Sequence, residues 1–218
     1  MYPTMTQYRN KLVENKKSYV FIVVFFLMAS KGNSQSEKKS FSSRLYFPFG
    51  IGYLNSPANN LKPGTILNMG VEYRLQDGNH GPYLRLNLDN RSNSYQRDAV
   101  DGTNIVQGKI KFNDYIGGVG YRMGIGRRFR QFALLQGGLS VCQFQNVAES
   151  GQSYVVENKE KTIPVLKAAG GIEYYVGKSS AITLEAGYIW HLEGTPFVHN
   201  QLSEGAFGIS IGFSSTLF

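Results

Sequence analysis

The chain has 218 residues, of which 42% are hydrophobic and 17% are charged, and its mean hydropathy is −0.25. These values exclude a bundle of membrane-spanning helices and a disordered, highly charged chain. Glycine is in excess, with 25 residues, and the 14 Tyr and 14 Phe make the chain rich in aromatic side chains. Without low-complexity repeats, this combination favours closely packed strands over helices.

The formal net charge is +8, but five of the basic residues and one acidic residue lie within the first 35 positions. The remainder holds 18 basic and 14 acidic residues, a net charge of +4, and no long Lys/Arg run. A nucleic-acid partner is therefore not expected. A single cysteine, Cys142, excludes an intramolecular disulfide and a cysteine-based zinc site.

Residues 1–35 are organised like a secretory signal peptide. Lys16 and Lys17 precede the apolar run 19–28, and small and polar residues follow it. The alternative is a membrane anchor, but the uncharged stretch of 13 residues falls short of the roughly 20 that a spanning helix needs. No cysteine follows the run, which argues against a lipoprotein anchor.

We therefore expect residues 1–35 to be a cleaved signal, residues 36–43 a short lead, and residues 44–218 a single exported domain. From Leu45 onward, apolar residues alternate with polar or small ones, and this period of two predicts β-strands. No segment shows helical periodicity. The alternation defines eight segments, which cover approximately residues 45–53, 67–75, 84–88, 115–125, 135–141, 166–176, 182–190 and 207–213.

The connections between these segments alternate in length. Short turns are predicted at Asp77–His80, Arg127–Arg130 and Gly177–Ser180. Long loops are predicted from Asn55, from Ser92 to Lys109, from Asn146 to Lys161, and from Glu193 to Glu204. This order is typical of an up-and-down meander with an even number of strands, whose two rims face different environments.

The alternation alone does not say which face is inside. In a soluble, lipocalin-like barrel the apolar face lines a cavity, whereas in an outer-membrane barrel it faces lipid. Glycines on the polar face favour the second arrangement, because they weaken a solvent-facing strand but let a narrow lumen close around larger side chains. These glycines are Gly50, Gly52, Gly70, Gly118, Gly120, Gly124, Gly138, Gly171, Gly187, Gly208 and Gly212.

The charges on the polar face also balance, four against four. A buried charge is costly unless it is paired, so equal numbers suit a filled interior; the alternative for each residue is a solvated surface charge. We expect a structural charge network in the lumen, made of Glu72, Arg74, Arg85, Asp89, Arg122, Lys167, Glu173 and Glu185.

Aromatic residues near the strand ends suggest two girdles at the membrane interfaces, with Tyr53, Tyr115, Tyr188 and Trp190 near the long loops and Tyr73, Tyr174 and Phe213 near the short turns. The predicted fold is all-β: an eight-stranded, antiparallel, up-and-down transmembrane β-barrel with a side-chain-filled lumen. Strands of about 9 to 11 residues are long enough to cross a bilayer. An open pore is not expected, because eight strands leave little room inside.

In strand number, loop alternation, export signal and final strand, the region from about Arg44 to Phe218 resembles the small eight-stranded outer-membrane β-barrel proteins, of the outer-membrane protein A barrel and outer-membrane protein X type. The resemblance implies the bacterial outer membrane as the location and outer-membrane lipid as a partner. It also implies that the barrel-assembly machinery recognises the final strand through a terminal aromatic residue. Here Phe218 lies on the opposite parity from Phe207 and Phe213, so either Phe213 closes the strand or a bulge resets the register.

The same resemblance brings in lipid A acyltransferases and deacylases, which use a His with a Ser and a carboxylate. His191, Glu193 and Ser203 are the nearest set in this chain, but no motif of either enzyme is matched and rim polar residues are the simpler interpretation. His80 is expected in a short turn, and Cys142 as a packed thiol in the lumen. No catalytic residue, cofactor or metal ligand is predicted.

Three functional hypotheses follow. The first is a non-enzymatic barrel that binds an envelope or surface partner through its rim or through the long connections from Ser92 and Asn146. The second is a lipid A-modifying hydrolase or transferase that uses His191. The third is a soluble, lipocalin-like carrier.

Overall fold

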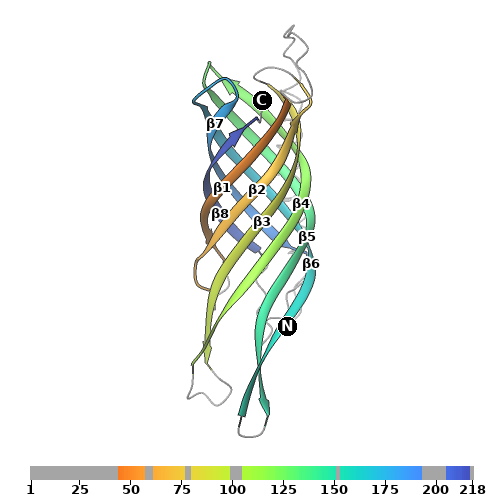
Figure 1. Ribbon diagram of the computed structural model, residues 1–218, viewed down its shortest axis with the longest axis vertical. Coiled ribbons are helices and arrows are strands. Elements are labelled where there is room, and N and C mark those ends of the chain that lie inside the picture. Colours follow the sequence, from red (N-terminus) through yellow and green to blue (C-terminus); the bar gives the residue numbers. More distant parts are fainter. Residues whose placement is uncertain are drawn as a thin grey trace, which may run out of the picture. The chain divides into compact units, whose positions relative to one another are not determined.

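The computed structural model describes residues 44–56, 61–76, 80–98, 105–150, 153–192 and 205–216, and it forms a closed antiparallel barrel (Figure 1). The strands follow the order of the sequence around the barrel, and β8 pairs with β1 to close it. They are β1 (Leu45–Asn55), β2 (Gly64–Arg74), β3 (Gly81–Asp98), β4 (Ile105–Ile125), β5 (Phe129–Ser150), β6 (Ser153–Tyr175), β7 (Ser180–His191) and β8 (Gly205–Ser215). The predicted all-β, up-and-down architecture is confirmed.

The outer surface of the barrel is apolar and the inner surface carries the charges. Leu86, Ile51 and Ile211 are 58 to 67% exposed, whereas Glu72 and Asp89, on the opposite parity, are fully buried. Burial of charge combined with exposure of large apolar side chains is the reverse of a water-soluble fold. It sets aside the lipocalin-like alternative. Among the described residues, no helix is long and apolar enough to cross a membrane.

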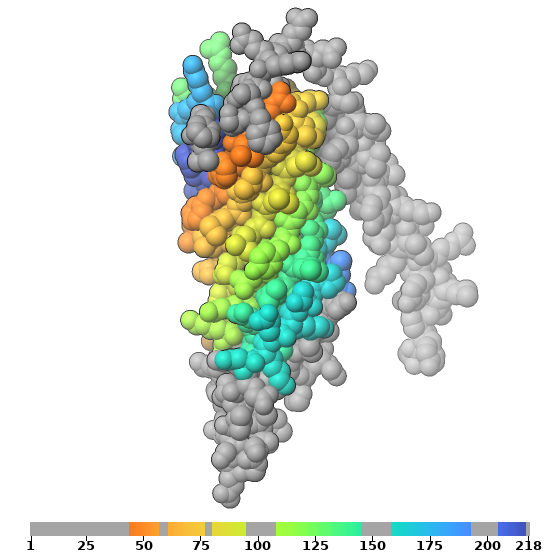
Figure 2. Space-filling view, turned by 45° about the vertical axis from the view of Figure 1, so that its right-hand side comes forward, coloured from red at the N-terminus to blue at the C-terminus, as the bar shows by residue number. Residues whose placement is uncertain are grey.

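Aromatic side chains gather toward both ends of this apolar band. Near one end Tyr53 and Tyr115 are more than half exposed, and the rings of Tyr188 and Trp190 lie 4.9 Å apart. Near the other, Tyr174 lies 5.0 Å from the Phe129 ring. Figure 2 shows the strands as oblique bands across the surface, the tilt that closure of a barrel requires.

Two of the predicted long loops are instead mostly strand. The stretch from Ser92 to Lys109 continues β3 and β4, and the stretch from Asn146 to Lys161 continues β5 and β6. β3 to β6 have 18, 21, 22 and 23 residues, against 11 or 12 in the other four strands. The prediction was wrong there because hydrophobic alternation stops where the outer face leaves lipid, while the backbone hydrogen bonds continue.

The opposite rim carries the short turns. Gly126 adopts φ +71°, which a residue without a Cβ accepts readily, and it lets β4 reverse into β5 within three residues. β6 returns to β7 through a similarly tight turn before Ser180. Most of the predicted Asp77–His80 turn and the predicted Glu193–Glu204 loop lie outside the described residues, as do the predicted signal and lead over 1–43.

The last strand alternates without interruption as far as the structure follows it. Ile209, Ile211 and Phe213 face outward, and Ser210 and Ser214 are buried. No bulge resets the register within β8, and Phe218 lies outside the described residues.

Candidate functional site

The eight charged residues assigned to the lumen all lie in it. Each is less than 10% exposed, and they are contributed by β2, β3, β4, β6 and β7. Strand parity turns them inward, and the register brings them to neighbouring levels: Glu72 pairs with Arg85 across β2–β3, and Asn68 with Asp89. Five of the eight strands are therefore connected through side chains inside the barrel as well as through their backbones.

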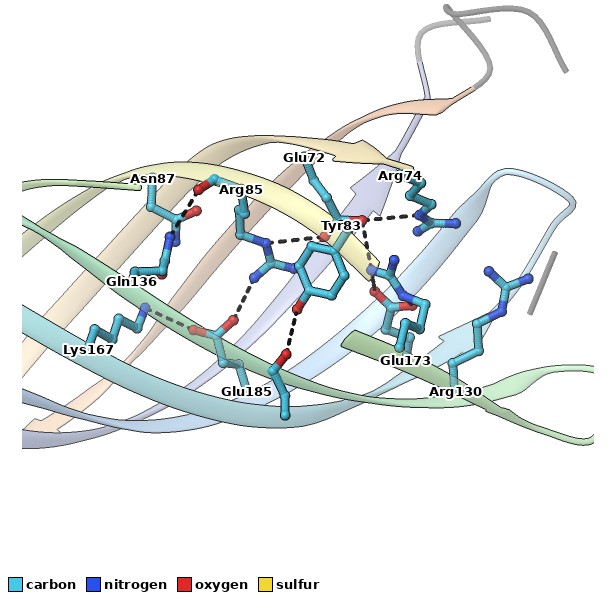
Figure 3. Close-up of polar contacts among 12 residues, drawn as sticks. Glu72, Arg74, Tyr83, Arg85, Asn87, Arg130, Gln136, Lys167, Glu173 and Glu185 are labelled. Atoms are coloured by element: carbon cyan, nitrogen blue, oxygen red, sulfur yellow. Dashed lines mark hydrogen bonds and ion pairs between the residues drawn. The ribbon is translucent and has the colours of Figure 1, made fainter. Parts of the chain in front are cut away.

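Toward the short-turn rim, the network is centred on Glu72 (Figure 3). Its carboxylate accepts hydrogen bonds from Arg74 Nε at 3.1 Å, Arg85 Nη2 at 2.9 Å and Arg122 Nη2 at 2.8 Å. Arg122 also donates to both carboxylate oxygens of Glu173 at 2.7 Å. One fully buried carboxylate thus accepts from three guanidinium groups, two of which also pair with other carboxylates: Arg122 with Glu173 and Arg85 with Glu185.

Further into the barrel, the network continues through Glu185. This carboxylate lies 2.9 Å from Arg85 Nη1 and 2.9 Å from Lys167 Nζ (Figure 3). Lys167 Nζ also lies 2.8 Å from Asp89 Oδ2. The Arg85–Glu185 pair joins β3 to β7 across the lumen. All eight residues therefore belong to one connected set of charge-assisted hydrogen bonds.

Sequence reasoning missed a further buried pair. Arg91 donates to both oxygens of Asp114, through Nε at 2.5 Å and through Nη2 at 2.9 Å, and both side chains are almost fully buried. Arg91 shares the parity of Asp89, so extending β3 by a few residues would have placed it in the lumen. The predicted segment 84–88 ends before Arg91, so the predicted charge network does not include this pair.

Aromatic rings fill the space between the charges. Tyr83 is fully buried, its hydroxyl donates to the Ala133 carbonyl at 3.4 Å, and its ring centre lies 4.6 Å from the Arg122 guanidinium. A Cβ on Gly120 would lie 2.2 Å from the Tyr83 ring, and one on Gly171 would lie 2.6 Å from the Phe132 ring. These two glycines therefore make room for the rings, which is the role inferred for glycines on the polar face.

The lumen near the opposite rim contains a large apolar cluster beside Arg91, Asp114 and His191, contrary to the expectation of a polar face throughout. A buried cluster closes this end, consisting of Ile110, Phe112, Ile116, Cys142, Phe144, Ile163, Val165 and Ile189, with Leu61 packed against it. Cys142 is free and fully buried there. Above the membrane the inner face is the only one that can be buried away from water, so the strands carry apolar residues on it.

His191 lies beside this cluster and is packed. Its Nε2 is 3.1 Å from Arg91 Nη2, and its ring stacks on Phe112 at 5.1 Å. A guanidinium can only donate, so Nε2 accepts and its lone pair is occupied. Glu193 and Ser203, the other members of the acyl-transfer set, lie outside the described residues. His80 is placed at the short-turn rim, where Nδ1 accepts from the Gly124 amide at 3.4 Å.

Among the described lumen residues, two cavities beside Glu185 and Ser210 measure about 10 Å³ each, enough for a single water molecule. Across the parts of the chain that the structure describes, no group of three or more His, Cys, Asp or Glu residues could hold a metal ion. Chemically, the lumen is a set of mutually compensated charges that binds the barrel wall together.

Comparison with known proteins shows similarity of the fold and not of the sequence. No protein-family model and no curated protein sequence matches the chain. Neisserial surface protein A superposes with a TM-score of 0.54 at 14% identity, over 79% of this chain and 97% of that one. The attachment invasion locus protein Ail of Yersinia pestis gives 0.46 at 16% identity, over 79% and 97%. The N-terminal β-barrel domain of Pseudomonas aeruginosa OprF gives 0.42 at 15% identity, over 79% and 96%.

Four observations point to the same fold: the apolar outer band, the charged and filled lumen, the short-turn rim and the likeness to Neisserial surface protein A. The chain is an eight-stranded transmembrane β-barrel with the fold of the small outer-membrane proteins.

Proposed function

We propose that the protein is a non-enzymatic, closed outer-membrane barrel that supports binding hairpins above the membrane. The observation that carries the proposal is the extension of four neighbouring strands beyond the lipid-facing band, above a lumen that is already filled. Figure 1 shows these strands leaving the barrel as two hairpins, β3–β4 and β5–β6. Extended strands on a rigid base present side chains in fixed positions, which suits recognition.

The filled lumen supports a role other than transport. Two barriers lie in series: the charge network around Glu72 and Glu185, and the apolar cluster around Phe112. We expect no stepwise conductance when the purified protein is inserted into planar lipid bilayers. Regular single-channel steps in the wild type would overturn the proposal of a closed barrel.

The binding role is tested by shortening each hairpin at a paired position. Joining Ser94 to Lys109 through Asn-Gly, or Phe144 to Lys159 in the same way, keeps the observed register and supplies a favoured hairpin turn. We expect both variants to retain the heat-dependent gel mobility of a folded barrel. We also expect them to lose photo-crosslinks that a reactive residue at the exposed position 143 forms on intact cells. Unchanged crosslinks in both variants would contradict a binding role for the hairpins.

Lipid A modification is the alternative activity. The occupied Nε2 of His191 and its stacking on Phe112 count against a general base at this position. Mass spectrometry of lipid A from cells that produce the wild type or His191→Ala tests it. We expect the two acylation patterns to be the same as that of cells lacking the protein; a pattern that depends on His191 would establish the enzyme instead.

We further propose that residues 1–35 direct export and are removed, and that the barrel-assembly machinery inserts residues 44–218 through the alternating face of β8. The apolar run after Lys16 and Lys17 and the uninterrupted outward row in β8 support these two steps. The intact mass of the protein purified from outer membranes tests the first step: a mass matching the full 218 residues would contradict cleavage.

A further inference from the structure

The extended wall of the barrel splits at one defined position. β4 pairs with β5 only as far as Lys111 and Gln143, whereas β3–β4 pairing continues to Asp98–Ile105 and β5–β6 pairing to Ser150–Ser153. The opening between the two hairpins, here called the fork cleft, has a volume of about 600 Å³. Its lining residues are Gly108, Lys109, Lys111, Gln143, Phe144, Asn158, Lys159 and Glu160.

The fork cleft is basic. Its described lining residues include three lysines and one acid, Glu160, which accepts a hydrogen bond from Gln143 Nε2 at 3.3 Å. Lys109 and Lys111 are exposed, and neither forms an ion pair with any side chain that the structure describes. Because both lysines are exposed, their ammonium groups are accessible to an anion from outside. This differs from the lumen, where each described lysine or arginine named above has a carboxylate partner.

The lysines lie at a particular height. Along the outward face of β4, the exposed apolar residues lie between Tyr115 and Ile125, and Lys111 precedes Tyr115 by four positions. At about 3.3 Å per residue and a tilt near 45°, Lys111 stands roughly 9 Å above the apolar band. The headgroup layer of one leaflet is about 5 to 8 Å thick. A lysine side chain can reach down to that layer, so the cleft opens at the level of lipid headgroups.

We propose that the fork cleft binds phosphate groups through Lys109, Lys111 and Lys159, and that these phosphates belong to the phosphorylated headgroup of a glycolipid in the outer leaflet. The inference rests on the proposed function, since it requires the hairpins to stand above the membrane. It goes further in naming the site and its ligand class. Lysine is suited to phosphate as a compact point charge, and three at one opening fit a headgroup with more than one phosphate.

A purely structural explanation exists for the same lysines. β4 and β5 each leave a backbone edge unpaired beyond Lys111 and Gln143 within the described part of the chain, and lysines on such edges prevent sheets from joining. This explanation predicts self-association when the lysines are lost, with no preference for phosphate. Binding and oligomeric state therefore have to be measured together.

The test uses the full mature protein in detergent micelles, with native mass spectrometry to count bound lipid. The probes are lipid A carrying its phosphates, the same lipid A after phosphatase treatment, a phosphorylated glucosamine disaccharide without acyl chains, and a polyglutamate peptide. The key variant is Lys109→Gln with Lys111→Gln. The matched control is Lys178→Gln, which removes an exposed lysine from the short turn at the opposite rim.

We expect the wild type and Lys178→Gln to bind phosphorylated lipid A at least tenfold more tightly than the dephosphorylated lipid. The double variant should lose about thirtyfold in affinity, as expected for two lysines near an anionic surface, and should stay monomeric. Equal binding of the two lipids, or an unchanged double variant, would overturn the site. Equal binding of the disaccharide without acyl chains, or preferential binding of a polyglutamate peptide, would overturn the lipid assignment. A double variant that self-associates but binds normally would favour edge protection instead.

Failure of this inference is distinguishable from failure of the proposed function. The hairpin truncations keep Lys109, Lys111 and Lys159, so they test the hairpins without removing the lysines. If the truncations abolish crosslinking while the double variant binds lipid A normally, only the phosphate site is wrong. If the truncations leave the crosslinks unchanged, the proposed binding role of the hairpins is wrong, whatever the double variant shows.

Discussion

At the scale of single residues, the lumen contains charges that stabilise the barrel only while they remain paired. Glu72 is the clearest case, because three guanidinium groups converge on one fully buried carboxylate. An ion pair buried in this way is not stabilising in itself relative to an apolar core, but the removal of one partner leaves an uncompensated buried charge.

Glu72→Gln should therefore destabilise the barrel by about 3 to 5 kcal/mol, the cost of breaking a buried ion pair. The measurement is urea unfolding in phospholipid vesicles, followed through the fluorescence of the single tryptophan, Trp190. Glu160→Gln, which neutralises an exposed glutamate, serves as the control and should lie within about 0.5 kcal/mol of the wild type. Equal losses in the two variants would show that the Glu72 network contributes nothing specific.

The glycines of the inner face allow a second prediction. Gly120→Ala would place a methyl group 2.2 Å from the Tyr83 ring, and overpacking of this kind costs about 1 to 3 kcal/mol. Gly137→Ala is the control, because the nearest atom to its Cβ would be 3.8 Å away. In a Tyr83→Leu background the cost of Gly120→Ala should largely disappear, as the unfolding free energies of the four variants would show. A cost that persists in that background would contradict the steric explanation.

At the scale of elements, the four long strands β3 to β6 pass from lipid to water along their length. On β3 the outward face passes from Leu86, 67% exposed in the lipid-facing band, to Asn90 and Ser92 beyond it. The outward face of β3 therefore carries apolar side chains within the membrane and polar side chains above it. Within lipid an outward apolar side chain is favourable, and above lipid the outward face meets water and no longer has to be apolar.

Leu86→Lys should destabilise the folded barrel by about 2 to 4 kcal/mol, since it places a charge near the middle of the bilayer. Ser92→Lys puts the same residue on the same face of the same strand, above the band, and should cost less than about 1 kcal/mol. Unfolding in vesicles gives both values. If the two substitutions cost the same, the level assigned to the membrane on β3 is wrong.

The sequence predicted the elements best where lipid imposes a pattern. Alternation located all eight strands and the parity of the eight lumen charges, because residues such as Leu86 and Arg85 must face opposite media. It did not predict the hairpins, since Ser92 and Asn93 are both polar and strand pairing leaves no trace in hydrophobicity there. Arg91 and Asp114, which lie near that boundary, were missed for the same reason. Which acid pairs with which base depends on register, and parity alone does not give it.

At the scale of the whole molecule, the two rims differ in the length of the connections that they carry. The short-turn rim holds Arg127, Arg128 and Lys178, and the hairpin rim holds the fork cleft. In barrels of this type the short turns face the periplasm and the long connections face outward. The hairpins are accordingly expected on the outer side of the membrane.

A membrane-impermeant maleimide tests this orientation on intact cells. Asn158→Cys, at an exposed position on β6, should be labelled, whereas Lys178→Cys should be labelled only after the outer membrane is permeabilised. The wild type provides the background, because its only cysteine, Cys142, is fully buried. The reverse labelling pattern would mean that the hairpins face the periplasm.

The seam between β1 and β8 also has a consequence for the order of events in time. It runs from the Phe47–Ser215 pair to the Asn55–Phe207 pair. Strand β1 therefore has no partner on this side until β8, the last strand, has been synthesised. Before then, both borders of the sheet carry backbone groups that lipid cannot satisfy, and Arg85 lacks Glu185, which lies 100 positions later. Membrane entry and closure of the seam are thus one event: a chain that stops before Gly205 should accumulate in the periplasm as a protease substrate rather than as a smaller membrane protein.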